Sequence, residues 1–174
     1  WAKLRWLKDE VPQLYERVRF VCTIADWIAL RLTGILKIER SSAIESGLVD
    51  IGSNNLTRDL AKVSGVTETD ALSTVDPGSI IGHVSSVASN EVGVPPGTPV
   101  VVAGPDTQVA LLALGASEPG HSGVTAGWTG TVQRVTPNLI RISDSNKCLW
   151  AGRHALVGRN VIEANTGIMG GGFD

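Results

Sequence analysis

The chain has 174 residues, 43% of them hydrophobic and 18% charged, so it can bury a core and is not a disordered tail. Its net charge is −2, from 15 basic and 17 acidic residues, and no run of Lys or Arg stands out. Without a basic patch, we expect no nucleic-acid partner. We also expect no membrane partner, because the apolar stretches are too short and interrupted to span a bilayer.

The first third of the chain is predicted to be mostly helical. The strongest helix is expected over residues 22–32, where apolar side chains recur at helical spacing and Thr33-Gly34 supplies the stop. A short apolar run over residues 35–38 is compatible with a strand. A second helix is expected to begin at Ser41 or Ser42, since serine is a favourable N-cap.

The middle of the chain alternates turn signals with short elements. A helix is expected over residues 56–63, and two turns are expected at Asp76-Pro77-Gly78-Ser79 and Pro95-Pro96-Gly97-Thr98. Between these turns, residues 80–84 predict a strand and residues 85–92 a helix closed by Gly93. The run Pro-Val-Val-Val-Ala that follows, residues 99–103, predicts a strand covered on both faces, as in a parallel sheet.

The pattern of apolar and polar residues changes after Gly120, where strands are expected to replace helices. Short alternating runs separated by Gly or Pro predict β-hairpins. These runs cover residues 122–126, 131–136, 148–151 and 160–164. A domain boundary is therefore expected within residues 117–120.

Several residues with reactive side chains have no supporting pattern around them. Cys22 and Cys148 lie outside any C-x-x-C pair, so both are interpreted as ordinary, mostly buried thiols of a cytoplasmic protein. His83, His121 and His154 have no second ligand at metal spacing, so each is expected at the surface or a sheet edge and no metal site is predicted. The five tryptophans are interpreted as core anchors because no basic residues interleave with them.

One turn carries a candidate catalytic group. Gly104-Pro105-Asp106-Thr107-Gln108 joins the predicted buried strand to an apolar helix, and reactive groups in open α/β sheets lie at the carboxyl ends of strands. Asp106 is therefore a candidate base, and Thr107 and Gln108 add groups suited to a polyhydroxylated ligand. From the residues alone the alternative stays open that Asp106 is only a helix N-cap, worth about 1 kcal/mol.

A second candidate is the segment Ala126-Gly127-Trp128-Thr129-Gly130-Thr131. Its two glycines flank hydroxyl residues at a turn between strands, so backbone N–H groups there can approach a phosphate closely. It is not a Walker A loop, because it has no Gly-Lys-Ser or Gly-Lys-Thr. An ordinary glycine hairpin is the open alternative.

Several of these segments, taken in order, resemble the FGGY family of carbohydrate kinases, in its xylulokinase-like part. The turn Gly104-Pro105-Asp106-Thr107-Gln108 falls where that family carries its Gly-x-Asp catalytic turn. The other similar pieces are Ala25-Asp26-Trp27-Ile28 with Leu32-Thr33-Gly34, Ser42-Ala43 with Gly47-Leu48-Val49-Asp50-Ile51, Gly82-His83-Val84, and Val94-Pro95-Pro96-Gly97-Thr98-Pro99-Val100. Their order and spacing hold over nearly the whole chain.

The resemblance implies an α/β fold of the actin-like, ribonuclease H-like ATPase type, present here in part. Residues 1–117 would be the later part of the N-terminal lobe, and residues 118–174 the opening hairpins of an incomplete C-terminal lobe. The implied activity is transfer of the γ-phosphoryl of MgATP to a hydroxyl of a ketose or polyol. Asp106 would be the base, and Asp106, Thr107 and Gln108 would bind the substrate.

The resemblance also implies how the nucleotide is bound. The phosphates of ATP would lie against Gly127, Thr129, Gly130 and Thr131, although Trp128 replaces a small residue of the family's Gly-Thr-Ser or Gly-Thr-Gly turn. ATP and Mg²⁺ are thus the expected cofactors, with a small sugar as substrate. A homodimer of the full-length protein is left open.

The family's Asp-x-Gly-Thr-Ser phosphate loop does not occur in this sequence. We therefore expect the chain to be a fragment that is inactive by itself. Two alternatives remain: a non-catalytic sugar-binding or regulatory module of the same fold, which Trp128 would suit, and a structural α/β domain in which Asp106 only caps a helix.

Overall fold

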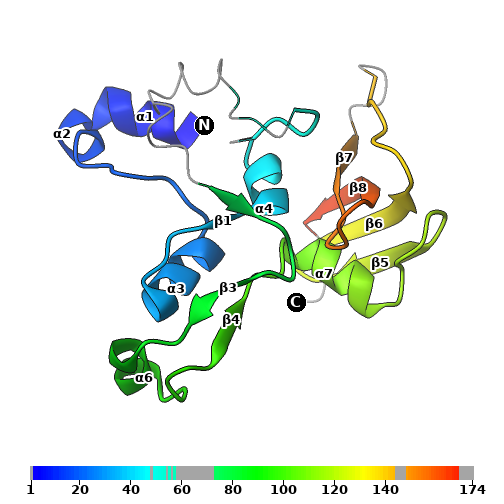
Figure 1. The fold of residues 1–174 in the computed structure, drawn as a ribbon. Coiled ribbons are helices and arrows are strands. Elements are labelled where there is room, and N and C mark those ends of the chain that lie inside the picture. Colours follow the sequence, from blue (N-terminus) through cyan, green and yellow to red (C-terminus); the bar gives the residue numbers. More distant parts are fainter. Residues whose placement is uncertain are drawn as a thin grey trace. The chain divides into compact units, whose positions relative to one another are not determined.

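The computed structural model describes residues 2–47, 49–53, 55, 57, 73–143 and 148–168. By its internal contacts the chain divides into two compact units, Trp1–Val102 and Ala103–Asp174. In chain order the elements are α1 (Ala2–Glu10), α2 (Pro12–Tyr15), α3 (Ile24–Thr33), β1 (Ile38–Glu39), α4 (Arg40–Glu45), β2 (Thr74–Val75), β3 (Ile80–His83), α6 (Ser86–Val92), β4 (Pro99–Val101), α7 (Asp106–Ala113), β5 (Ser122–Ala126), β6 (Thr129–Thr136), β7 (Leu149–Arg153) and β8 (Asn160–Ile168) (Figure 1). Apart from Thr57, the helix predicted over residues 56–63 lies outside the described residues.

Helix α3 confirms the strongest helix prediction. The Thr23 hydroxyl accepts a hydrogen bond from the Asp26 backbone N–H at 3.2 Å, and the Asp26 carboxylate accepts one from the Thr23 N–H at 3.0 Å. This reciprocal capping box satisfies two backbone donors at the helix start. The helix ends at Gly34, whose φ of 75° is a conformation that glycine adopts without steric cost.

Helix α4 starts on a different cap from the predicted serines. The N-cap is Glu39, whose carboxylate accepts hydrogen bonds from the backbone N–H groups of Ser41 and Ser42 at 2.7 and 2.8 Å. The two serines therefore lie inside the first turn. The expected strand shrinks to β1, Ile38–Glu39, which pairs in parallel with β2.

The segment β3–α6–β4 follows the predicted order. Ser85 caps α6 by accepting a hydrogen bond from the Ala88 N–H at 3.1 Å, and Gly93 ends the helix. Both predicted turns form as well, with backbone bonds from Ser79 to Asp76 (3.1 Å) and from Thr98 to Pro95 (3.3 Å).

The prediction of a covered, parallel strand over residues 99–103 is wrong. Strand β4 runs antiparallel to β3, and the Val101 side chain is 53% exposed. A run of valines fits any pleated strand, so it did not discriminate between a covered and a half-covered one. Two core clusters occur in the first unit, one of Ala29, Ile81 and Val102 and one of Ile38 and Ala43.

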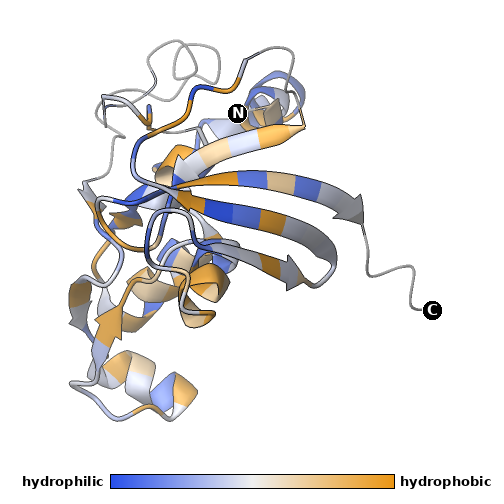
Figure 2. Cartoon of the chain, turned by 90° about the vertical axis from the view of Figure 1, so that its right-hand side faces the viewer, coloured by the Kyte–Doolittle hydropathy of each residue, from blue (hydrophilic) through white to orange (hydrophobic). Residues whose placement is uncertain are grey.

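The second unit is a four-stranded antiparallel sheet in the order β5-β6-β8-β7, with α7 packed on β5. All four predicted strands are confirmed, and hydrophobic and hydrophilic bands occur along them (Figure 2). Leu111 of α7 is fully buried and packs with Val135 and Val161. Gly123 leaves the space for it, because a Cβ there would lie 2.7 Å from Leu111 Cδ1.

The interpretation of the tryptophans as core anchors is wrong for three of them. Trp6, Trp27 and Trp128 are 60%, 52% and 71% exposed. Trp150 packs against the core of the second unit, and Trp1 lies outside the described residues. A large indole is seldom fully enclosed, so its presence in a sequence does not by itself locate a core.

The interpretation of the cysteines as mostly buried is wrong for Cys148. Cys148 is exposed, whereas Cys22 is partly buried. Desolvation by burial, together with the nearby Asp26, raises the pKa of the Cys22 thiol.

In the part of the chain that the structure describes, no helix is long and apolar enough to cross a membrane.

His154 is a correction, because it is buried rather than at the surface. Its Nε2 bonds to the Ala116 carbonyl oxygen at 3.1 Å, and its Nδ1 accepts from the Leu156 N–H at 2.9 Å. Burial lowers the pKa of this imidazole, so the neutral ring is the favoured form. His83 and His121 are exposed, as predicted.

Candidate functional site

Asp106 opens helix α7 at an exposed position. Gly104 has a φ of 106°, which permits the sharp entry into the helix, and Pro105 is the N-cap with no side-chain capping bond. The Asp106 Oδ1 accepts a hydrogen bond from the Thr107 N–H at 2.8 Å. Asp106 is therefore the first helical residue, and Pro105 holds the N-cap position.

The environment of Asp106 suits a carboxylate that acts on a ligand. Negative charge is favourable in the first turn of a helix. Among the described residues, the Asp106 carboxylate makes no hydrogen bond other than the one from the Thr107 N–H. Most of its acceptor capacity is thus available, because a carboxylate offers about four lone-pair sites.

Thr107 and Gln108 form a hydrogen-bonded pair behind Asp106. The Thr107 hydroxyl donates to Gln108 Oε1 at 2.8 Å, and Thr107 is half-buried. Gln108 is fully buried, and its Nε2 has no partner among the described residues. The three predicted substrate residues are therefore arranged from exposed to buried along the first turn of α7.

The second candidate segment is the turn between β5 and β6. The Gly127 N–H donates to the Thr129 carbonyl oxygen at 3.1 Å, which closes the turn. Trp128 is 71% exposed, so its indole extends into solvent and does not fill the turn. A Cβ added to Gly127 would meet no atom within 4 Å, which leaves this stretch of backbone open to approach.

The remaining predicted nucleotide residues lie further into the sheet. The Gly130 carbonyl oxygen accepts a hydrogen bond from the Thr166 hydroxyl at 3.0 Å. Thr131 is 1% exposed, and its hydroxyl bonds to that of Thr125 on the neighbouring strand. The predicted set therefore divides into Gly127 and Thr129, which are exposed at the tip, and Gly130 and Thr131, which are buried.

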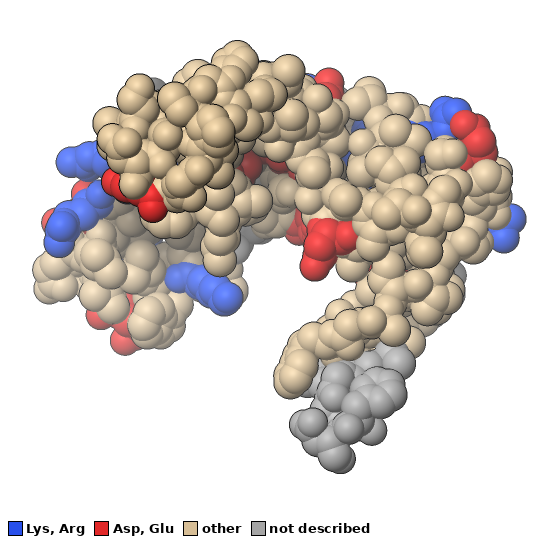
Figure 3. All heavy atoms as spheres, turned by 90° about the horizontal axis from the view of Figure 1, so that it is seen from below, with Lys and Arg blue, Asp and Glu red and all other residues tan. Residues whose placement is uncertain are grey.

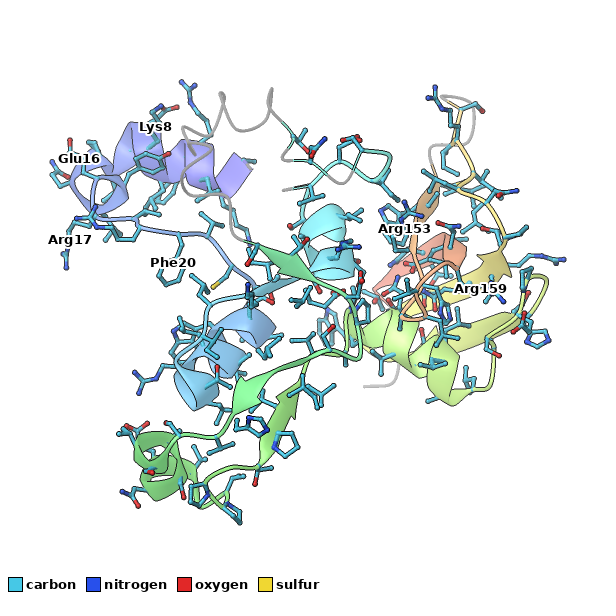
Figure 4. All side chains as sticks on the ribbon, in the orientation of Figure 1. Lys8, Glu16, Arg17, Phe20, Arg153 and Arg159 are labelled. Carbon is cyan, nitrogen blue, oxygen red and sulfur yellow. The ribbon has the colours of Figure 1, made fainter. Side chains whose placement is uncertain are left out.

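Sequence reasoning missed a polar pair on the same sheet, formed by the buried Gln133 and the partly buried Glu163. Gln133 is 1% exposed, and its Nε2 donates to Glu163 Oε2 at 2.8 Å across β6 and β8. Gln133 alternates with the buried Thr131 and Val135, and this inward position in the strand was the available signal. On the same unit, the labelled Arg159 makes an exposed ion pair with Glu118 at 2.9 Å (Figure 4).

Charged side chains are scattered over the face of the molecule that Figure 3 shows. Figure 3 shows one face of the molecule, on which Lys and Arg side chains occur in small separate groups among uncharged residues. In the described part of the chain, no three potential ligands among His, Cys, Asp and Glu come together as a metal-binding group.

Comparison with known proteins gives these segments a context. Residues 1–113 match the FGGY family of carbohydrate kinases, N-terminal domain. Autoinducer-2 kinase of Salmonella paratyphi B is 33% identical over 159 residues, and that of Yersinia pestis is 34% identical over 158 residues. Each of these matches covers 90% of the chain but only 29% of the curated relative's length.

Solved structures show the fold. Xylulose kinase from Rhodospirillum rubrum matches with a TM-score of 0.84 and 24% identity, over 97% of this chain and 34% of that one. Plasmodium falciparum glycerol kinase, solved with ADP, matches with a TM-score of 0.80 and 17% identity, over 98% of this chain and 35% of that one. The predicted actin-like, ribonuclease H-like fold, present in part, is confirmed.

The boundary between lobes stays a prediction near residue 117. The match to the N-terminal domain ends at residue 113, whereas the second compact unit already begins at Ala103, because α7 packs on β5.

The match to the N-terminal domain covers most of the chain, and the ordered motifs of the sequence resemble the same family. The chain belongs to the FGGY family of carbohydrate kinases.

Proposed function

We propose that the whole protein is an ATP-dependent sugar kinase that transfers the γ-phosphoryl of MgATP to a hydroxyl of a ketose or polyol. Asp106 is the base. The observation that carries this assignment is the exposed carboxylate at the start of α7, engaged only by the Thr107 N–H among the described residues. Most of its lone pairs therefore face a ligand instead of the protein.

Asp106 orients the acceptor hydroxyl and takes its proton as the new bond to phosphorus forms. Phosphoryl transfer depends mainly on positioning and on stabilising charge, so one well-placed carboxylate is the expected contribution at the acceptor oxygen. Thr107 and Gln108 complete the substrate side of the site. Thr107 is half-buried next to Asp106, and its hydroxyl donates a hydrogen bond to the Gln108 side-chain oxygen.

The nucleotide phosphates lie against the turn that contains Gly127 and Thr129, with Gly130 and Thr131 supporting it from the sheet. The uncovered backbone at Gly127 and the outward Trp128 fit this role, because neither obstructs a phosphate at the turn. Mg²⁺ would be held largely by the phosphates and water and would neutralise charge on the transferred group. The proposed location is cytoplasmic.

The test is to replace Asp106 by Asn in the whole protein. This change preserves shape and removes the proton acceptor, so turnover with a ketopentose or another polyol should fall by roughly 10²–10⁴-fold. Steady-state phosphorylation of a sugar panel measures it. Turnover by Asp106→Asn equal to that of the wild type would show that Asp106 is not the base.

The exposed Trp128 motivates a second candidate, a non-catalytic sugar-binding or regulatory module of the same fold. In that case the whole protein would bind a sugar without phosphorylating it. Calorimetric sugar binding with no ATP-dependent product, by protein whose folding has been verified, would favour this candidate over the kinase.

A further inference from the structure

The side-chain amide of Gln108 is buried behind the proposed base and is not fully satisfied. Gln108 is 0% exposed and lies one turn before Leu111, on the face of α7 that packs into the core. Its Nε2 has no hydrogen-bond partner among the described residues. A methionine of similar length would fill the same space without a buried, unpaired donor, so packing alone does not explain a glutamine here.

The hydrogen bond to the Gln108 side-chain oxygen determines whether the Thr107 hydroxyl can donate to a ligand or only accept from it. The Thr107 hydroxyl donates its single hydrogen to Gln108 Oε1 at 2.8 Å. With that hydrogen engaged, Thr107 Oγ1 offers only lone pairs to a ligand and acts as an acceptor. Without Gln108, the same hydroxyl would rotate freely and could donate or accept.

Asp106 supplies a second acceptor at the same turn. Its Oδ1 is held against the Thr107 backbone by the 2.8 Å bond from the Thr107 N–H. The turn therefore presents two adjacent acceptors and no side-chain donor from these two residues. A ligand that satisfies both must bring two donors, and neighbouring hydroxyl groups on a carbon chain provide them.

We propose that Gln108 is a positioning residue that fixes Thr107 as an acceptor beside Asp106, so that this turn selects substrates with two neighbouring hydroxyl groups. The inference rests on the proposed kinase function. One hydroxyl passes its proton to Asp106 while its oxygen bonds to the γ-phosphorus and the bond from that phosphorus to the β,γ-bridging oxygen breaks, leaving ADP. The neighbouring hydroxyl donates to Thr107 and stays unmodified.

The test uses the whole protein and matched pairs of substrates. D-xylulose is compared with its 4-deoxy analogue, and glycerol with 1,3-propanediol, which lacks the middle hydroxyl. Gln108→Met and Thr107→Val should each lower kcat/KM for the diol about tenfold, the effect of one hydrogen bond, and leave the deoxy analogue unchanged. The double variant should lose no more than either single variant, and Thr107→Ser should retain discrimination.

The outcomes separate this inference from the proposed function. Equal losses for a diol and its deoxy analogue, or additive losses in the double variant, would show that Gln108 serves packing only. Should Gln108→Met fail to fold, unchanged discrimination in Thr107→Val would overturn the inference. Turnover that depends on Asp106 but shows unaltered discrimination rejects this inference alone, whereas a wild-type protein that phosphorylates no polyol rejects the proposed function and this inference together.

Discussion

Among the described residues, Asp26 and Asp106 each lie in the first turn of a helix, and the structure gives them opposite surroundings. Asp26 of α3 is 2% exposed, and its carboxylate accepts hydrogen bonds from the Thr23 N–H, the Thr23 hydroxyl and the Glu39 N–H. Asp106 of α7 is exposed and, among the described residues, accepts only from the Thr107 N–H. The same residue type at a helix start is thus fully engaged in one unit and largely free in the other.

The difference teaches how to separate a structural acid from a candidate catalytic one. Asp26 uses its lone pairs to join the start of α3 to β1, through Glu39. Glu39 continues this network by capping α4. Asp106 holds no other element in place within the described residues. An acid that the fold does not use is the one that can bind a ligand without loss of stability.

The largest stability effect expected from this contrast is at Asp26. Asp26→Ala in the whole protein removes three hydrogen bonds to a buried carboxylate and leaves the Glu39 N–H unpaired, so it should cost about 2–4 kcal/mol. Asp106→Ala is the matched control and should cost less than about 0.5 kcal/mol. Thermal unfolding of both variants measures the difference. Equal destabilisation would contradict the distinction between a structural Asp26 and a largely unengaged Asp106.

A smaller effect is expected at Gly127, which extends the contrast to the nucleotide turn. A Cβ there meets no atom within 4 Å, so Gly127→Ala should leave the unfolding temperature unchanged. The added methyl would hold a phosphate away from the backbone, and we expect the KM for ATP to rise about tenfold, or roughly 1.4 kcal/mol.

The control for that experiment is Ser122→Ala, at the exposed far end of β5. It should change neither the KM for ATP nor the KM for the sugar. A Gly127→Ala protein with an unaltered KM for ATP would remove the turn from the proposed nucleotide site.

The smallest effect is a pH dependence from His154, the buried counterpart of the exposed His121. Burial lowers the pKa of His154 in the folded state, while in the unfolded chain it titrates near 6.5. Below that pH the unfolded state binds a proton that the folded state does not, so stability is full above about pH 6.5 and falls as the pH drops further. Unfolding temperatures between pH 8 and 5 should therefore decline less in His154→Gln than in the wild type; parallel curves would contradict this.

Local signals in the sequence predicted the local structure well. The stop of α6 at Gly93, and the alternating runs that became β5 to β8, depend on neighbouring residues only. The errors concern contacts between distant segments. The valine run of β4 did not reveal its antiparallel partner β3, and no neighbour of His154 indicated its bond to Ala116.

The candidate site residues stay predictions from the sequence, and their arrangement could not be inferred from it. The turn around Asp106 was identified from its position after a strand and from the ordered motifs. That Asp106 is exposed, that Pro105 takes the cap and that Gln108 is buried beneath Thr107 depend on how α7 packs on the sheet. Those contacts lie between segments far apart in the sequence, where periodicity carries no information.

The most direct test of the contrast between the two acids is a single-turnover measurement on the whole protein with Asp106→Asn. With ATP and sugar both bound, the chemical step should slow by roughly 10²–10⁴-fold while the unfolding temperature and the sugar Kd stay near wild-type values. An unchanged chemical step would contradict the role of Asp106 as the base. A large fall in unfolding temperature would contradict the claim that the fold does not use it.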